Sequence, residues 1–154
     1  MVSPALFGVS LKDDFLAWQQ LLPIEITSDA LWHATAYRLA LFASDRCWPD
    51  LRKLTDDPCS RHIADQLGRA LGSIPANYSE AYSRSGVADR CRFYEYSLGS
   101  TREARAWYFK ARHVISEERI REALELLTSI ARLLTVTIVR ERARAPKKPK
   151  GRHL

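Results

Sequence analysis

Residues 66–80, QLGRALGSIPANYSE, combine the apolar spacing of a buried helix with a proline at its centre. Apolar side chains recur here at three- and four-residue steps: Ile63, Leu67, Ala70, Ile74, Tyr78 and Ala81. Pro75 has no amide hydrogen and leaves the carbonyl of Leu71 without its helical partner, so it predicts a kink. The residues around it are small or polar: Gly72, Ser73, Ala76 and Asn77. They predict that a neighbouring helix approaches closely.

Three further helices are predicted around this one. The first begins at Ser28 or Asp29, and Pro49 with the run 55–58 marks its connection to the second, which covers about residues 58–83. The third covers about residues 87–114, and the fourth begins after a Ser116 cap. The fourth carries a heptad seam: Ile120, Leu124, Leu127, Ala131, Leu134 and Ile138. We therefore predict an all-α, antiparallel up-down four-helix bundle with a proline-kinked second helix.

Charge and patterning divide the chain into three parts. Residues 1–28 are poorly patterned and predict an N-terminal extension with a short helix near residues 14–22, while residues 29–139 form the bundle. Residues 140–154 hold seven basic residues and one acidic residue, so they account for the whole net charge of +6 and predict a flexible basic tail. Residues 1–57 are acidic, with eight acidic and five basic side chains.

Several classes of protein are disfavoured by the composition. No apolar run is long enough to span a membrane, and no secretory signal is apparent, so we predict a cytoplasmic protein. The three cysteines lack paired spacing, which argues against a disulfide framework. The histidines are scattered, and no phosphate-binding loop or nucleophile elbow occurs. We predict no catalysis, metal or cofactor. A metalloenzyme in the bundle core is the alternative that metal analysis would decide.

Two strings of residues resemble a known family. They comprise Gln66, Arg69, Ser73, Pro75, Asn77 and Glu80 in the second helix, and Gly99, Ser100 and Glu103 in the third. They resemble the signature of the four-helix-bundle proteins found in intervening sequences of bacterial large-subunit ribosomal RNA genes. That family includes the accessory protein of diversity-generating retroelements. The resemblance covers about residues 30–139, and it departs from the family at Ala81, where glycine is usual.

The resemblance implies an assembly and a partner. Members of the family form homopentamers, and the retroelement proteins partner a reverse transcriptase. Second apolar stripes, such as that of Tyr94, Leu98 and Phe109, agree with a subunit interface, although a wide core would explain them too. Arg69, Asn77 and Glu80 also have two interpretations. They form either a ligand-binding cluster or a hydrogen-bonded network that holds the kink or a subunit contact.

Basic residues are the main functional indication. Arginine binds phosphate through a planar fork, and neutralising phosphates releases counterions. The candidate nucleic-acid-binding residues are Arg84, Arg90, Arg92, Arg102, Arg105, Arg112, Arg140, Arg142, Arg144, Lys147, Lys148, Lys150 and Arg152. We therefore predict a non-catalytic, oligomeric accessory protein that binds RNA or DNA, with structured RNA or RNA–DNA hybrids favoured. The alternative is a protein-interaction scaffold that binds no nucleic acid.

Overall fold

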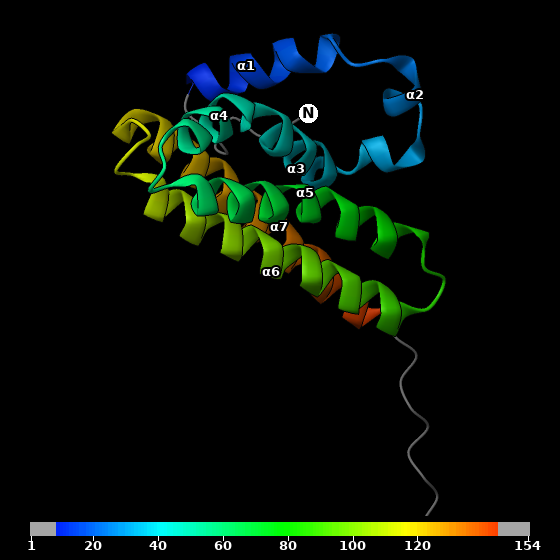
Figure 1. Ribbon diagram of the computed structural model, residues 1–154. Helices are drawn as coiled ribbons and strands as arrows, with labels where there is room; N and C mark the ends of the chain where they lie inside the picture. The colour runs from blue at the N-terminus through cyan, green and yellow to red at the C-terminus, as the bar shows by residue number, and fades with distance from the viewer. Residues whose placement is uncertain (1–8, 145–154) are drawn as a thin grey trace, which may run out of the picture.

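The computed structural model describes residues 9–144, and this part of the chain contains helices and no strand (Figure 1). The shorter elements come first: α1 (Val9–Gln20), α2 (Ile24–Thr27), the 3₁₀ helix η2 (Ala30–His33), α3 (Thr35–Arg46) and α4 (Trp48–Asp56). The longer helices follow: α5 (Arg61–Ser83), α6 (Val87–Ala111) and α7 (Glu117–Ala143). The prediction of an all-α protein is confirmed.

The three long helices share one core with α3. α5 packs along α6, α6 packs along α7, and α3 lies against both α5 and α7 (Figure 1). Short connections join the long helices, so consecutive ones run in opposite directions. The predicted seam of α7 faces this core, since Ile120, Leu127, Leu134 and Ile138 are buried. No helix of residues 9–144 has an apolar stretch long enough to cross a membrane.

The predicted first helix is wrong in its bounds, because the structure divides that region. The Asp29 carboxylate caps η2 by accepting the amide hydrogen of Leu31 at 2.7 Å. α3 then ends at Arg46, and α4 begins at Trp48 with Pro49 in its first turn. The first amide groups of a helix have no intrahelical partner. A proline there costs no hydrogen bond, so Pro49 starts a helix instead of marking a connection.

Helix α1, within the predicted N-terminal extension, contributes to the core. Leu11 and Phe15 are buried, and the Phe15 ring meets Phe42 of α3 edge-on at 5.3 Å between centroids. The Trp18 indole donates to the Asp45 carboxylate of α3 at 2.7 Å. Aromatic packing and a hydrogen bond therefore attach α1 to α3.

Helix α5 passes through the buried Pro75 as one element. Polar side chains bond to the backbone around the proline: the Asn77 amide donates to the carbonyl of Ser73 at 2.9 Å, and the Ser97 hydroxyl of α6 donates to that of Ile74 at 2.8 Å. Gly72 is exposed, and a Cβ atom added there would meet no atom within 4 Å. The predicted close approach at Gly72 therefore does not occur within one copy of the chain.

Candidate nucleic-acid interface

A shallow groove runs between α6 and α7 on the side of these helices away from the core. Leu98, Arg102 and Arg105 are one helical turn apart on α6 and form one wall. Helix α7 contributes Thr128, Arg132 and Thr135 to the opposite wall, and we call its apolar lining residues Ala131, Val136 and Val139 the groove floor. The groove continues past Arg102 toward the end of α7, where its lining residues are Glu95, Ile138, Val139 and Arg142. It therefore has an apolar floor with guanidinium groups along both walls.

Arginines on both walls of this groove lack a carboxylate partner. Arg102, Arg105 and Arg132 are exposed, and within residues 9–144 none of them forms an ion pair. The structure thus brings two sequence-predicted arginines of α6 beside Arg132. Arg132 was not predicted because its position across the groove depends on how α6 and α7 pack. These three cations are available for an anionic ligand.

The arginines around the α5–α6 turn are largely engaged within the chain. Arg90 pairs with Glu141 of α7 at 3.0 Å and donates to the carbonyls of Arg84 and Ser85, so it fixes the turn. Arg84 pairs with Glu80. Its guanidinium lies 5.0 Å from the centroid of the Phe93 ring. Arg90 therefore fixes the turn, and its role in binding nucleic acid stays a prediction. Its partner Glu141 could not be identified from the sequence because the two residues are 51 positions apart.

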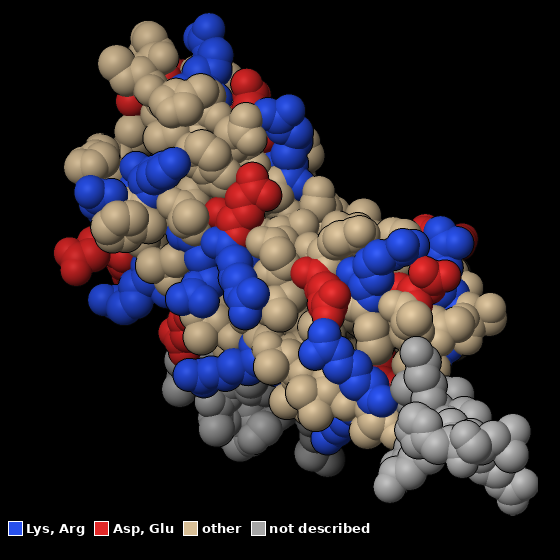
Figure 2. All heavy atoms as spheres, turned by 90° about the horizontal axis from the view of Figure 1, so that it is seen from below, with Lys and Arg blue, Asp and Glu red and all other residues tan. Residues whose placement is uncertain are grey.

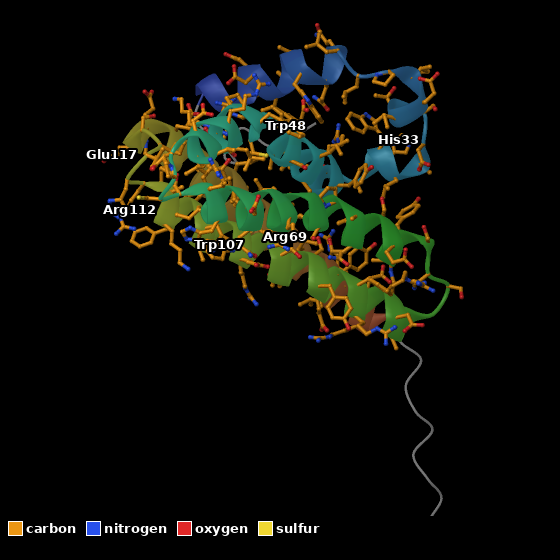
Figure 3. The ribbon with its side chains drawn as sticks, viewed as in Figure 1. His33, Trp48, Arg69, Trp107, Arg112 and Glu117 are labelled. Atoms are coloured by element: carbon orange, nitrogen blue, oxygen red, sulfur yellow. The ribbon has the colours of Figure 1, made fainter. Side chains whose placement is uncertain are left out.

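Arg92 and Arg112 remain exposed and combine with aromatic rings. Arg92 pairs with Asp89 at 3.0 Å and also lies over Phe93. Arg112 lies 4.0 Å from the centroid of Phe109, at the end of α6 (Figure 3). Phe109 is 56% exposed, so this cation–aromatic pair reaches solvent. The pair lines a separate hollow with Glu117, Ile120, Arg121 and Leu124.

Helix α7 continues to Ala143, into the segment predicted as a tail. Arg140, Arg142 and Arg144 are thus ordered on or next to this helix, and two of them are ion-paired. Arg142 pairs with Glu95 of α6, and Arg144 pairs with Glu141 at 2.7 Å. The remaining predicted tail residues lie outside the described residues: Lys147, Lys148, Lys150 and Arg152.

Basic side chains are numerous on the face below α6 in Figure 1. Figure 2 views this face and shows Lys and Arg side chains spread across it, with fewer acidic side chains between them. Lys110 adds a cation 3.9 Å from the centroid of Trp107. Such a face attracts polyanions at long range as well as through contact.

A buried polar network, absent from the sequence prediction, joins the helices at the other end of α7. The Asp50 carboxylate of α4 accepts from the Tyr108 hydroxyl and from Arg119 Nε, each at 2.9 Å. Arg119 also donates to the carbonyl of Arg46 at 3.2 Å. Burial and the nearby Asp50 charge raise the pKa of Tyr108. One feature of the sequence could have indicated this buried carboxylate. Asp50 stands three residues after Cys47, so the two share one face of a helix, and Cys47 is buried.

The signature residues of α5 do not gather into one cluster. Asn77 bonds to its own helix, Glu80 pairs with Arg84, and Arg69 is exposed without an ion pair in the described part of the chain. Gln66 and Ser73 are half-buried on the same helix. In the third-helix string, Gly99 and Glu103 are exposed and Ser100 is half-buried. Within the described part of one copy, Arg69, Asn77 and Glu80 therefore share no hydrogen bond, and a role in holding a kink or a subunit contact stays a prediction.

Metal-ligating and nucleophilic groups are dispersed over residues 9–144. No group of three or more His, Cys, Asp or Glu side chains there could hold a metal ion. Cys47 and Cys91 are buried, and Cys59 is exposed. Burial raises the pKa of the Cys47 thiol to about 12.

The described residues thus form helices and no strand, with an arginine-lined groove between α6 and α7. The model of the 23S rRNA-intervening sequence protein family matches residues 35–136. The chain belongs to this family, which confirms the resemblance predicted from its two strings of residues. The match begins with α3, so α1, α2 and η2 precede it.

A solved structure agrees with this assignment. It is described as a protein with unknown function from the S23 ribosomal protein family of Bacteroides thetaiotaomicron VPI-5482. It is 22% identical, the match covers 68% of this chain and 98% of that chain, and the TM-score is 0.63. This likeness shows a shared fold. No curated protein matches the chain significantly.

Proposed function

We propose that this protein binds nucleic acid, RNA in particular, through the α6–α7 groove and that it acts without catalysis. The observation that carries the proposal is a set of exposed arginines on both walls of the groove that form no ion pair within residues 9–144: Arg102, Arg105 and Arg132. A guanidinium presents a planar fork of donors that matches two phosphate oxygens. Guanidinium groups that face one another across a groove can contact successive phosphates of one strand.

The recognition is of the nucleic-acid backbone more than of base sequence. Phosphate contacts fix the position of a protein on its ligand but carry no sequence information. Structured RNA is recognised mainly through its shape and its backbone. The exposed Phe109 beside Arg112 offers a stacking surface for an unpaired base near the groove.

The proposal includes a homopentamer of four-helix bundles, each with a kinked second helix. The four bundle helices would be α3, α5, α6 and α7, which pack on one another. Exposed glycines on α5 and α6 support an interface between copies. A Cβ atom added at Gly72 or Gly99 would meet no described atom within 4 Å, so packing within one copy does not require glycine at either position. Tyr96, which is 52% exposed, offers apolar surface on α6. Several copies of the groove on one ring would raise avidity without new contacts.

A cytoplasmic accessory role beside a reverse transcriptase is part of this proposal. The resemblance of the signature strings to retroelement accessory proteins motivates it. The protein would hold template RNA near the enzyme. Gel filtration of the co-expressed proteins, with and without ribonuclease, would distinguish direct contact with the enzyme from a bridge of RNA.

A protein-interaction scaffold is the second candidate, and the groove floor favours it. Val136 is 46% exposed and Val139 is 60% exposed beside the arginines. An acidic amphipathic helix would place apolar side chains on this floor and carboxylates on the guanidinium groups. The affinity of such a helix for the groove would depend mainly on apolar contacts, whereas the affinity of RNA would depend mainly on charge.

The test compares two sets of charge-removing substitutions in the full-length chain. The groove variant carries Arg102→Gln, Arg105→Gln and Arg132→Gln. The control carries Arg52→Gln, Lys53→Gln and Arg69→Gln, which remove the same number of exposed cations elsewhere, none of them ion-paired in the described part of the chain. RNA binding is measured across a salt series. Each lost phosphate contact lowers the slope of log K against log salt by roughly 0.7–0.9, so the groove variant should lose about 2.

The outcomes separate the two candidates. The control should retain nearly all of the salt slope. Equal loss in both variants would mean that net charge alone drives binding and would contradict a groove site. No RNA binding by the wild-type protein at low salt would favour the scaffold, whose partner binding should then weaken on Val136→Ser and Val139→Ser.

A further inference from the structure

Two tryptophans and a carboxylate line a surface pocket that shares no residue with the arginine groove. The pocket lies where α1, α3 and α4 meet, and its lining residues are Trp18, Leu22, Leu41, Ser44, Asp45 and Trp48. Trp48 stands at the start of α4 and is 57% exposed (Figure 3). Trp18 comes from α1, which precedes the residues matched by the family model. The pocket therefore depends on a helix added to the family fold.

The charge at this pocket is negative and uncompensated. Asp45 accepts the indole hydrogen of Trp18 at 2.7 Å, which orients the carboxylate beside the ring. Within residues 9–144, Asp45 forms no ion pair. Tryptophan is the aromatic side chain that attracts cations most strongly, and a carboxylate adds direct charge attraction. This chemistry suits an ammonium or guanidinium group.

The chain itself contains a matching cationic segment. Residues 145–154, APKKPKGRHL, hold three lysines and one arginine and no acidic residue. Residues 1–57, which supply the whole pocket, have the opposite charge balance, with eight acidic and five basic side chains. Charge complementarity therefore selects this segment as the occupant of the pocket.

We infer that the Trp18–Trp48–Asp45 pocket binds a lysine of the C-terminal segment 145–154 of this chain. The ammonium group lies between the indoles and pairs with Asp45. The contact uses residues outside the α6–α7 groove, so it does not depend on the nucleic-acid proposal.

The test follows the indole rings by ¹⁹F NMR in full-length protein labelled with 5-fluorotryptophan. The four tryptophan signals are assigned by single replacements with phenylalanine. A neutral-segment variant carries Lys147→Ser, Lys148→Ser, Lys150→Ser and Arg152→Ser. The Trp18 and Trp48 signals should differ between wild type and this variant, while that of Trp107 on α6, which does not line the pocket, should not. Adding a synthetic peptide of residues 145–154 to the variant should restore the wild-type positions.

Two matched substitutions complete the test. Asp45→Asn in the neutral-segment protein should weaken peptide affinity about tenfold, because it removes the charge at the pocket. Asp56→Asn, which removes an exposed carboxylate elsewhere on α4, should leave the affinity unchanged. Identical Trp48 signals in the wild type and the neutral-segment variant would overturn the inference. So would equal peptide affinity in the Asp45→Asn and Asp56→Asn proteins. No nucleic acid is present, so the result is independent of RNA binding.

Discussion

Replacing Asp50 by asparagine should destabilise the fold by about 2–3 kcal/mol. The carboxylate is 3% exposed and accepts hydrogen bonds from Tyr108 and Arg119. Removing one member of a buried ion pair typically costs about 3–5 kcal/mol. We expect less here, about 2–3 kcal/mol, because Arg119 retains 18% side-chain exposure and has Glu122 at 3.5 Å. At roughly 2–4 °C per kcal/mol, the melting temperature should fall by about 4–12 °C.

The measurement is denaturant and thermal unfolding followed by circular dichroism. Asp56→Asn on the same helix is the control, and its exposed carboxylate should contribute less than about 0.5 kcal/mol. Tyr108→Phe should cost about 1–2 kcal/mol, and the double variant should lose less than the sum because both groups share one contact. An Asp50→Asn protein as stable as the control, or strict additivity, would refute the role of this network.

Four further predictions follow from individual side chains. Phe15→Ala should lower the free energy of unfolding, measured with denaturant, by about 3–5 kcal/mol because Phe15 is 1% exposed. A loss below about 1 kcal/mol would contradict the packing of α1 on the core. Ser97→Ala should cost about 1–2 kcal/mol by removing the donor to the Ile74 carbonyl, and an unchanged midpoint would contradict that contact. Gly99→Ala should stabilise each copy by up to about 1 kcal/mol but should weaken the assembly, as measured by sedimentation. An unchanged mass of the assembly would contradict a place for Gly99 in the interface between copies. Cys47, with its pKa raised to about 12, should remain a thiol at pH 8. It should therefore react with iodoacetamide far more slowly than the exposed Cys59, as measured by peptide mass spectrometry. Equal rates would contradict the burial of Cys47.

The long helices were predictable because their ends carry local signals. Gly86 precedes α6, and the Ser116 hydroxyl accepts the amide hydrogen of Arg119 at the start of α7. The division between α3 and α4 was missed because Pro49 is compatible with both a break and a helix start. The contribution of α1 to the core was missed because Phe15 is buried against Phe42, which is distant in the sequence.

The candidate site was predictable only in part, for a similar reason. Helical periodicity placed Arg102 and Arg105 on one face of α6. Periodicity does not give the register between helices, so it could not place Arg132 opposite them or pair Arg90 with Glu141. Both contacts depend on tertiary packing. The same limit hid the pocket of Trp18 and Trp48, which comes from two separate helices.

The most direct test of the central claim is arginine footprinting of the full-length protein with phenylglyoxal, in the presence and absence of structured RNA. Modified peptides are quantified by mass spectrometry. RNA should protect Arg102, Arg105 and Arg132 in the groove, while exposed Arg52 on α4 should be modified equally in both conditions. Unchanged modification of the three groove arginines, under conditions where RNA is bound, would contradict the proposed interface.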